Sequence, residues 1–272
     1  MKIKFIGTGS AHCLENYQTN IIIEKNNKRL LFDAGSDAKW SLNNAGLSYL
    51  DIDAIYITHL HADHIGSLED IAFCSYFDKR CKEKISLIGN NELVRELWNN
   101  SLSGGLKSIQ GKKTTLHDFF DVEMVKKNHQ FFWEDIRFQI VQSIHIVDEY
   151  AIVPSFGLMA CDPVDGKKVY FTGDTQHCPN QIICFYNEAD LIIQDCETTS
   201  FASGVHAHYQ ELVGLPENVK KKMLLVHYQD NVILEGFEKW TNKATNDGFS
   251  KSPNFVPKGY ELNTADIFKT IF

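Results

Sequence analysis

The chain of 272 residues contains few arginines and no closely paired cysteines. Only four of its 27 basic residues are arginine, and its formal net charge is −8. A dedicated nucleic-acid-binding protein usually carries a basic surface that contacts phosphates, so the composition argues against such a surface. The seven cysteines are odd in number and form no CxxC pair, which indicates reduced thiols rather than a disulfide framework.

Long apolar runs are also missing. No stretch approaches the roughly 20 apolar residues that a membrane-spanning helix needs. The N-terminal sequence MKIKFI turns directly into GTGS, which leaves no apolar core of a secretory signal. We therefore expect no membrane partner and a cytoplasmic location. The hydrophobic fraction of 43% is that of a globular protein rather than of a disordered chain.

Short strand-like runs alternate with helical stretches along the chain. Apolar and β-branched runs predict strands at Lys2–Ile6, Asn20–Glu24, Arg29–Asp33, Ala54–Thr58, Ile85–Gly89, Ile136–Ile144, Ala151–Ala160, Lys168–Thr172, Leu191–Gln194 and Met223–Val226. Helical spacing of apolar residues predicts helices at Gly66–Lys79, Asn91–Asn99, Pro179–Asn187, Tyr209–Leu215 and Val232–Trp240. This order, with no linker, favours a single α/β domain over residues 1–272.

Two segments show no clear periodicity. The stretch Asn99–Thr115 is rich in Gly, Ser, Asn and Lys, which predicts a functional or mobile loop. The tail from Thr241 onward has sparse apolar residues, and we expect it to wrap irregularly over the core.

One segment concentrates groups that bind metals. Directly after the predicted strand Ala54–Thr58, the sequence HLHADH supplies His59, His61, Asp63 and His64. Neutral imidazole and carboxylate are preferred ligands of zinc and related ions. Because alternate residues of an extended segment point the same way, His59 and His61 can bind one ion. Where the chain turns into a helix, Asp63 and His64 can face a second ion.

The HLHADH segment resembles the HxHxDH signature of the metallo-β-lactamase superfamily, and FDAG at Phe32–Gly35 resembles the turn that lies beneath that family's metal site. The resemblance extends over most of the chain. It implies an αββα sandwich, in which two mixed β-sheets are flanked by helices. It also implies three further ligands, and the sequence contains candidates in the expected order: His145, Asp174 within GDT, and His227.

Matched to the family, these residues form two ligand sets. The resemblance implies that the first ion is bound by His59, His61 and His145, and the second by Asp63, His64 and His227, with Asp174 bridging the two. Iron proteins of this fold typically carry Glu where this chain has His61. We therefore expect two divalent ions, zinc foremost, with manganese and iron left open.

Other polar residues lie near these ligands in the sequence. His206 precedes His227 by 21 residues, which matches a substrate-facing histidine of the phosphodiesterase branches, with His208 as the alternative. Asp195 and Glu197 follow a predicted strand, where they either orient ligating imidazoles or form surface ion pairs.

Two adjacent divalent ions indicate hydrolysis, because they lower the pKa of a shared water and bind the oxygens of an in-line displacement at phosphorus. Asp63 is expected to orient the resulting hydroxide, and His206 to donate to the developing oxyanion or leaving oxygen. The motifs resemble the RNase Z and small phosphodiesterase branch. Only 29 residues separate His145 from Asp174, which leaves no room for a tRNA-binding arm.

We therefore expect a dinuclear phosphodiesterase that acts on a small cyclic phosphate or a nucleotide phosphodiester. Two alternatives stay open at this point. One is hydrolysis of a lactone or thioester by the same hydroxide, and the other is a di-iron protein of this fold that binds or reduces oxygen. A homodimer is an expectation of the resemblance alone.

Overall fold

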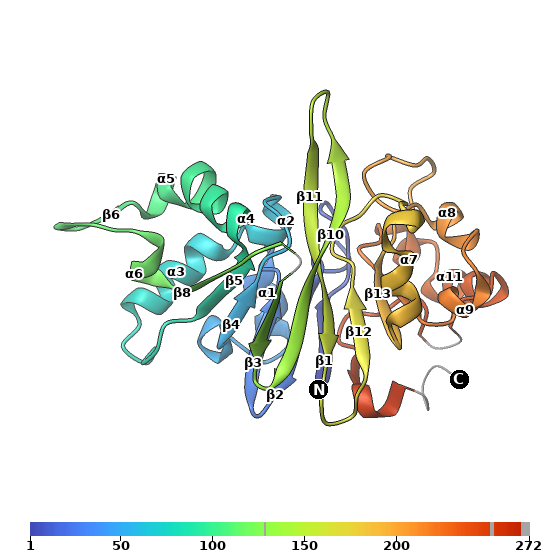
Figure 1. Cartoon of the computed structure of the whole chain (residues 1–272), viewed down its shortest axis with the longest axis horizontal. Helices are drawn as coiled ribbons and strands as arrows, with labels where there is room; N and C mark the ends of the chain where they lie inside the picture. The colour runs from blue at the N-terminus through green and yellow to red at the C-terminus, as the bar shows by residue number, and fades with distance from the viewer. Residues whose placement is uncertain (128, 251–252, 268–272) are drawn as a thin grey trace.

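The computed structural model describes residues 1–127, 129–250 and 253–267. Two β-sheets pack face to face at the centre of the molecule, and helices cover their outer faces (Figure 1). Among the described residues, no helix combines the length and apolar character that crossing a bilayer requires.

The first sheet has the strand order β15-β1-β2-β3-β4-β5-β8 and is mixed. The strands β1, β2, β3 and β15 pair antiparallel, whereas β3, β4, β5 and β8 pair parallel. Its strands are β1 Lys2–Gly7, β2 Asn20–Lys25, β3 Lys28–Phe32, β4 Ala54–Tyr56, β5 Ser86–Asn90, β8 Asp121–Val125 and β15 Glu261–Asn263.

The second sheet has the order β14-β13-β12-β11-β10-β9 and is also mixed. Its parallel part, β12 to β14, is connected through helices, as parallel strands require. Its strands are β9 Gln130–Trp133, β10 Ile136–Val147, β11 Ile152–Cys161, β12 Lys168–Phe171, β13 Leu191–Asp195 and β14 Met223–Val226. The long hairpin of β10 and β11 rises beyond the rest of the sheet (Figure 1).

The helices are short. They are α1 Ala38–Asn44, α2 Ala62–Ile65, α3 Leu68–Phe77, α4 Asn91–Glu96, α5 Ser103–Leu106, α6 Leu116–Phe119, α7 Pro179–Glu188, α8 Tyr209–Val213, α9 Glu217–Lys220, α10 Asn231–Leu234 and α11 Phe237–Asn246. Single 3-10 turns lie at Tyr49–Asp51 and Thr264–Asp266, and a π-helical stretch lies at Leu97–Leu102.

Aromatic side chains pack between the two sheets. Phe32 of the first sheet stacks on Phe171 of the second with ring centroids 5.2 Å apart, and on Tyr56 at 5.6 Å. The stack continues through Phe131, 6.0 Å from Tyr56, to Phe138 at 5.0 Å. Burial of each large apolar side chain contributes about 1.5–3 kcal/mol. This core therefore holds together the strand ends that carry the polar residues described below.

The segment Asn99–Thr115 differs from the predicted loop. It completes the π-helical stretch, forms α5 and then a small hairpin of β6 Ser108–Ile109 and β7 Lys112–Lys113 that projects from one side of the molecule (Figure 1). Leu102 and Leu106 are buried and anchor it to the core. The segment predicted as a functional or mobile loop is thus largely helix and hairpin, because these two buried leucines anchor it despite its polar composition.

The C-terminal part is more regular than predicted. The expected helix Val232–Trp240 is interrupted at Gly236, whose φ of +113° separates α10 from α11. α11 continues to Asn246, and β15 pairs antiparallel with β1 at the edge of the first sheet. Residues 251–252 and 268–272 of this tail lie outside the described residues.

Candidate metal centre

The residues predicted to bind metal meet at one edge of the two sheets. His59 and His61 lie between the carboxyl end of β4 and α2, and α2 carries Asp63 and His64. Asp174 follows β12 and His227 follows β14, and the parallel pairing of β12, β13 and β14 directs their carboxyl ends to the same edge. His145 reaches it from within the antiparallel strand β10. The seven predicted ligands, here called the metal centre, therefore come from four separate parts of the chain.

The first ligand group consists of His59, His61, His145 and Asp174, whose ligand atoms all lie within 4.8 Å of one another. His145 Nε2 is 3.2 Å from His61 Nδ1. Asp174 Oδ2 is 3.7 Å from His59 Nε2 and 3.9 Å from His145 Nε2. His61 is the exposed member of this group, so the metal centre opens to solvent on its side.

The second group consists of Asp63, His64, Asp174 and His227, and all four are buried. His64 Nε2 lies 3.2 Å from both Asp63 Oδ2 and Asp174 Oδ2. His227 Nε2 lies 3.3 Å from Asp63 Oδ2 and 3.7 Å from Asp174 Oδ2. The same oxygen of Asp174 therefore belongs to both groups, and its role as a bridging ligand stays a prediction.

Irregular backbone directs three of these side chains. The pairing of β10 with β11 shifts register between Ile144 and Ile146, so His145 lies at a bulge inside the strand. The predicted strand Ile136–Ile144 had placed His145 directly after its end. Bulges redirect a side chain out of the regular alternation. His227 has a φ of +62°, and Gly173, directly before Asp174, has a φ of +60°. A Cβ on Gly173 would also lie 2.8 Å from Ser155 Oγ, so this turn requires glycine.

Buried polar groups contact the Nδ1 atoms of two predicted ligands, His64 and His145. Asp33, with a φ of +62°, accepts hydrogen bonds from the Thr58 amide and hydroxyl, both at 2.9 Å. Its Oδ2 also lies 2.7 Å from His64 Nδ1. The carbonyl oxygen of Val205 lies 2.9 Å from His145 Nδ1. The contacts to His64 and His145 place a proton on Nδ1 of each ring and leave Nε2 free to bind an ion.

Asp195, at the end of β13, contacts two further imidazoles. Its Oδ2 lies 2.9 Å from His206 Nδ1 and accepts the Thr175 amide at 2.9 Å, while its Oδ1 lies 3.4 Å from His227 Nδ1. The ring of His206 stacks 4.8 Å from that of His227 and lies 5.2 Å from that of His145. The structure thus brings His206 to the metal centre and places Asp195 behind it as an orienting carboxylate.

His208 and Glu197 make local hydrogen bonds within the segment between β13 and α8. His208 caps α8, and its Nε2 lies 2.9 Å from the Thr199 carbonyl oxygen. Glu197 Oε2 accepts the Ser203 amide at 2.8 Å. Neither side chain touches the metal centre through these contacts. They hold the segment between β13 and α8 instead.

Charges inside the metal centre shift pKa values in opposite directions. Burial lowers the pKa of His59 well below 6.5, and the neighbouring His64 adds to this effect. Burial also disfavours the charged forms of His64 and His227, but the Asp174 carboxylate and other acidic neighbours outweigh it and raise both pKa values well above 6.5. The imidazoles, led by His227, hold the pKa of Asp174 well below its usual value against the effect of burial.

The donor set fits metal ions. His59 Nε2, His64 Nε2 and Asp174 Oδ2 are buried and make no hydrogen bond within the chain. Buried polar atoms are normally paired, so three unpaired atoms, one from each group and one from the shared Asp174, indicate that another group binds there. Imidazole nitrogen and carboxylate oxygen in two adjoining groups suit two divalent ions, which would replace protons on His64 and His227.

The comparison with known families decides the family of the chain. Residues 1–251 match the family model described as "Anti-Pycsar protein Apyc1". A curated relative of that name from Bacillus phage vB_BveM-Goe7 is 32% identical over 241 residues, which cover 85% of this chain and 90% of the relative. The chain belongs to the Apyc1 family.

Solved structures show the fold of this Apyc1-family protein. It is similar to the metallo-β-lactamase-fold protein YhfI from Bacillus subtilis, with a TM-score of 0.73, 17% identity and coverage of 96% of this chain and 98% of the other. It is also similar to a diphosphatase from the PhnP family, with a TM-score of 0.71, 17% identity and coverage of 96% and 97%. The predicted αββα sandwich and the family resemblance are therefore confirmed.

A large cavity in the described part of this Apyc1-family chain lies away from the metal centre. It has a volume of about 1030 Å3 and is lined by residues near the amino ends of β4 and β5, among them Lys28, Asp53 and Trp133. Lys28 Nζ is 2.7 Å from Asp53 Oδ1, so these two charges neutralise each other. A titratable cluster with orphaned donors marks a functional site better than cavity size does.

Three contacts of the Apyc1-family metal centre had no signal in the sequence. Thr58, Thr175 and the carbonyl of Val205 hold Asp33, Asp195 and His145, respectively. Threonine and a main-chain carbonyl are common everywhere in a chain. Only the tertiary structure shows that they touch these groups.

Proposed function

We propose that this Apyc1-family protein is a dinuclear metal-dependent phosphodiesterase that hydrolyses a small cyclic nucleotide. The observation that carries the proposal is the pair of ligand groups that share Asp174, beside a histidine held by a buried carboxylate. Membership of the Apyc1 family supports the cyclic-nucleotide substrate. The PhnP-family diphosphatase supports phosphate chemistry on this fold by analogy. With no membrane-spanning helix among the described residues, we keep the cytoplasm as the proposed location.

In this proposal the first group, His59, His61 and His145, holds one ion, and Asp63, His64 and His227 hold the other, with Asp174 shared. Two divalent ions, zinc foremost, would supply Lewis-acid activation of water and of the phosphoryl oxygens. They would also supply positive charge that a chain of net charge −8 otherwise lacks. The donor set contains no thiolate, so manganese or iron would fit it as well.

Two residues act on protons. Asp63 accepts a hydrogen bond from the attacking water and so orients its lone pair toward phosphorus. Burial lowers the pKa of His206, but the charge of Asp195 outweighs it and raises that pKa above 6.5. The raised pKa favours the protonated form of His206, whose Nδ1 is held by Asp195. His206 gives a proton to the leaving oxygen as the P–O bond of the ring breaks and the new P–O bond forms.

The test combines metal analysis with hydrolysis assays on the purified protein. We expect about two zinc or manganese ions per chain, turnover of bis(p-nitrophenyl) phosphate and of 3′,5′-cyclic nucleotides, and loss of turnover after chelation. His117 is exposed and lines the cavity that lies away from the metal centre, so His117→Ala is the matched control for His206→Ala. Hydrolysis of a lactone or thioester without phosphodiester turnover would contradict the proposal.

Binding of iron would favour the di-iron alternative. Two iron ions per chain, an oxygen-sensitive absorbance band and no hydrolysis would identify a di-iron oxygen-binding or redox protein instead. The homodimer expected from the family resemblance stays a prediction, which light scattering of the same preparation tests.

A further inference from the structure

Exposed apolar side chains collect on the segments that carry or hold the metal centre. In the part of the chain that the structure describes, Phe201 is 71% exposed, Tyr150 93%, Val147 58% and Ile152 48%. Apolar groups in contact with water gain free energy when a ligand covers them, and clusters of them mark binding sites. These four residues come from two segments, the β10–β11 hairpin tip and the loop between β13 and α8.

The loop that carries Phe201 is closed at its base. The Glu197 amide donates to the Ala207 carbonyl and the Tyr209 amide donates to the Glu197 carbonyl, both at 2.9 Å. Within the loop, the Ser203 amide donates to Glu197 Oε2 at 2.8 Å. Phe201 is therefore exposed on a loop whose backbone is fixed by these hydrogen bonds.

The same loop is attached directly to the metal centre. Four residues after Phe201, the Val205 carbonyl oxygen lies 2.9 Å from His145 Nδ1. The next residue, His206, stacks on His227. The position of Phe201 is thus coupled to one proposed ligand and to the proposed proton donor.

The hairpin adjoins this loop at His145. His145 lies on β10, two residues before Val147 and five before Tyr150. The Tyr150 and Ala151 amides both donate to Asp148 Oδ1 at 2.7 Å, which closes the turn. Figure 1 shows the hairpin and the segment between β13 and α8 rising on the same side of the molecule. We call these two segments the rim, because both are attached to the metal centre at His145 and both carry exposed apolar side chains.

We propose that the base of the bound nucleotide stacks on Phe201, which makes Phe201 a specificity-determining residue. This inference rests on the proposed function. A cyclic nucleotide whose phosphodiester binds at the metal centre carries a flat base several ångströms away, and an aromatic ring on the rim matches that face. Every base has a π-face, so stacking tolerates both purines and pyrimidines. The rim thus selects nucleotides over other phosphodiesters and discriminates weakly among bases.

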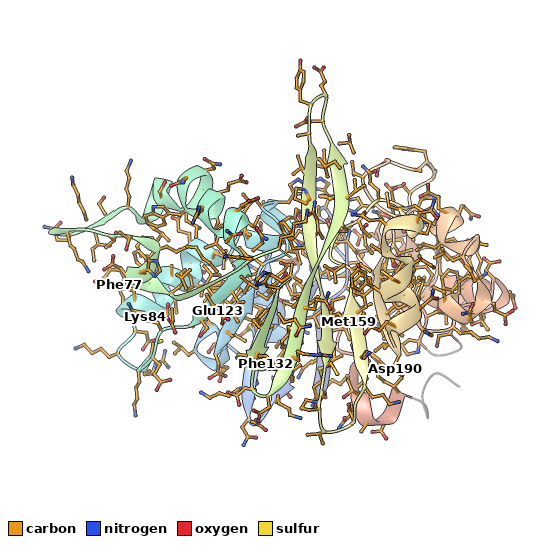
Figure 2. The ribbon with its side chains drawn as sticks, in the orientation of Figure 1. Phe77, Lys84, Glu123, Phe132, Met159 and Asp190 are labelled. Atoms are coloured by element: carbon orange, nitrogen blue, oxygen red, sulfur yellow. The ribbon has the colours of Figure 1, made fainter. Side chains whose placement is uncertain are left out.

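The test compares Phe201→Ala with Phe132→Ala. Phe132 is 67% exposed and lies on β9, at the end of the sheets away from the hairpin tip (Figure 2), so it controls for loss of an exposed ring. For a 3′,5′-cyclic nucleotide we expect KM to rise about tenfold in Phe201→Ala, as loss of one stacked base implies. KM for a cyclic ribose phosphate without a base should stay the same, and metal content should not change.

Two further substitutions separate stacking from general packing. Phe201→Trp should restore the KM of the wild-type protein, whereas Phe201→Leu should not, because leucine is apolar but has no π-face. An unchanged KM in Phe201→Ala, or an equal rise for the base-free substrate, would overturn the inference. A change in oligomeric state at constant KM would overturn it as well, and would identify the rim as a contact between copies of this chain.

Equilibrium binding keeps this inference distinct from the proposed function. A non-hydrolysable cyclic nucleotide phosphorothioate is titrated calorimetrically into the metal-loaded wild-type protein and each variant. If the wild-type protein hydrolyses no phosphodiester, the proposed function fails, but a tenfold weaker Kd in Phe201→Ala still supports base stacking. An equal Kd in wild type and Phe201→Ala refutes the stacking, whatever the activity shows.

Discussion

The contact between Asp33 and His64 makes a sharp prediction about the second ion. Asp33 is 1% exposed, accepts two hydrogen bonds from Thr58 and lies 2.7 Å from His64 Nδ1. Asparagine has the same shape as aspartate and tolerates a left-handed backbone, so Asp33→Asn can keep the turn at its φ of +62°. Alanine at this position would add backbone strain to the loss of the carboxylate.

The expected effect of Asp33→Asn follows from the position of one proton. With a carboxylate at position 33, His64 keeps its proton on Nδ1 and its Nε2 is free for the ion. In the Asp33→Asn variant, the amide nitrogen of the new side chain can donate to Nδ1, which moves the ring proton to Nε2 and blocks binding there. Loss of such an orienting partner weakens metal affinity by about 10- to 100-fold.

The assay is a metal titration of chelator-treated protein, with zinc binding followed by calorimetry. We expect weaker binding of one ion in Asp33→Asn, normal binding of the other by the group of His59, His61 and His145, and recovery of activity in excess zinc. Asp70 is exposed on α3, so Asp70→Asn is the matched control. Two ions bound with wild-type affinity in Asp33→Asn would refute the proton argument.

Four other predictions concern the metal centre and the core. Asp174→Ala should lose both ions and all turnover together, as elemental analysis and kinetics would show, because both ligand groups share this carboxylate. His206→Ala should keep its metal but lose about 10²- to 10⁴-fold in kcat, the usual contribution of a general acid, and unchanged kcat would remove its assigned role. Phe171→Ala should lower the free energy of unfolding by about 3–5 kcal/mol in denaturant titrations, since its ring is fully buried between the sheets. In the metal-free protein the raised pKa values of His64 and His227 contribute stability below pH 6.5 that is lost as pH rises through the folded-state pKa, so thermal unfolding should show falling stability there. Over the same interval zinc affinity should rise, because fewer protons compete for these nitrogens.

The local elements and the order of the candidate ligands could be predicted from the sequence. Apolar runs such as Met223–Val226 form strands because their side chains are buried on both faces, and that strand has the predicted bounds. The HLHADH segment was recognisable because imidazole and carboxylate groups rarely gather so closely without a metal to bind. His227 and Asp174 could be predicted as candidates because each follows an apolar run that reads as a strand.

Tertiary structure alone decided how these groups meet. The bulge that turns His145 inward depends on the pairing of β10 with β11, and the β15–β1 pair joins the two ends of the described chain. The partners Asp33 and Asp195 lie 31 and 11 residues from the imidazoles they orient, His64 and His206. The first contact depends on the parallel pairing of β3 with β4 and the second on the fold of the loop between β13 and α8, and no local pattern records either. The position of Phe201 next to the metal centre also follows only from the tertiary structure, because its loop contacts His145 through the Val205 carbonyl oxygen.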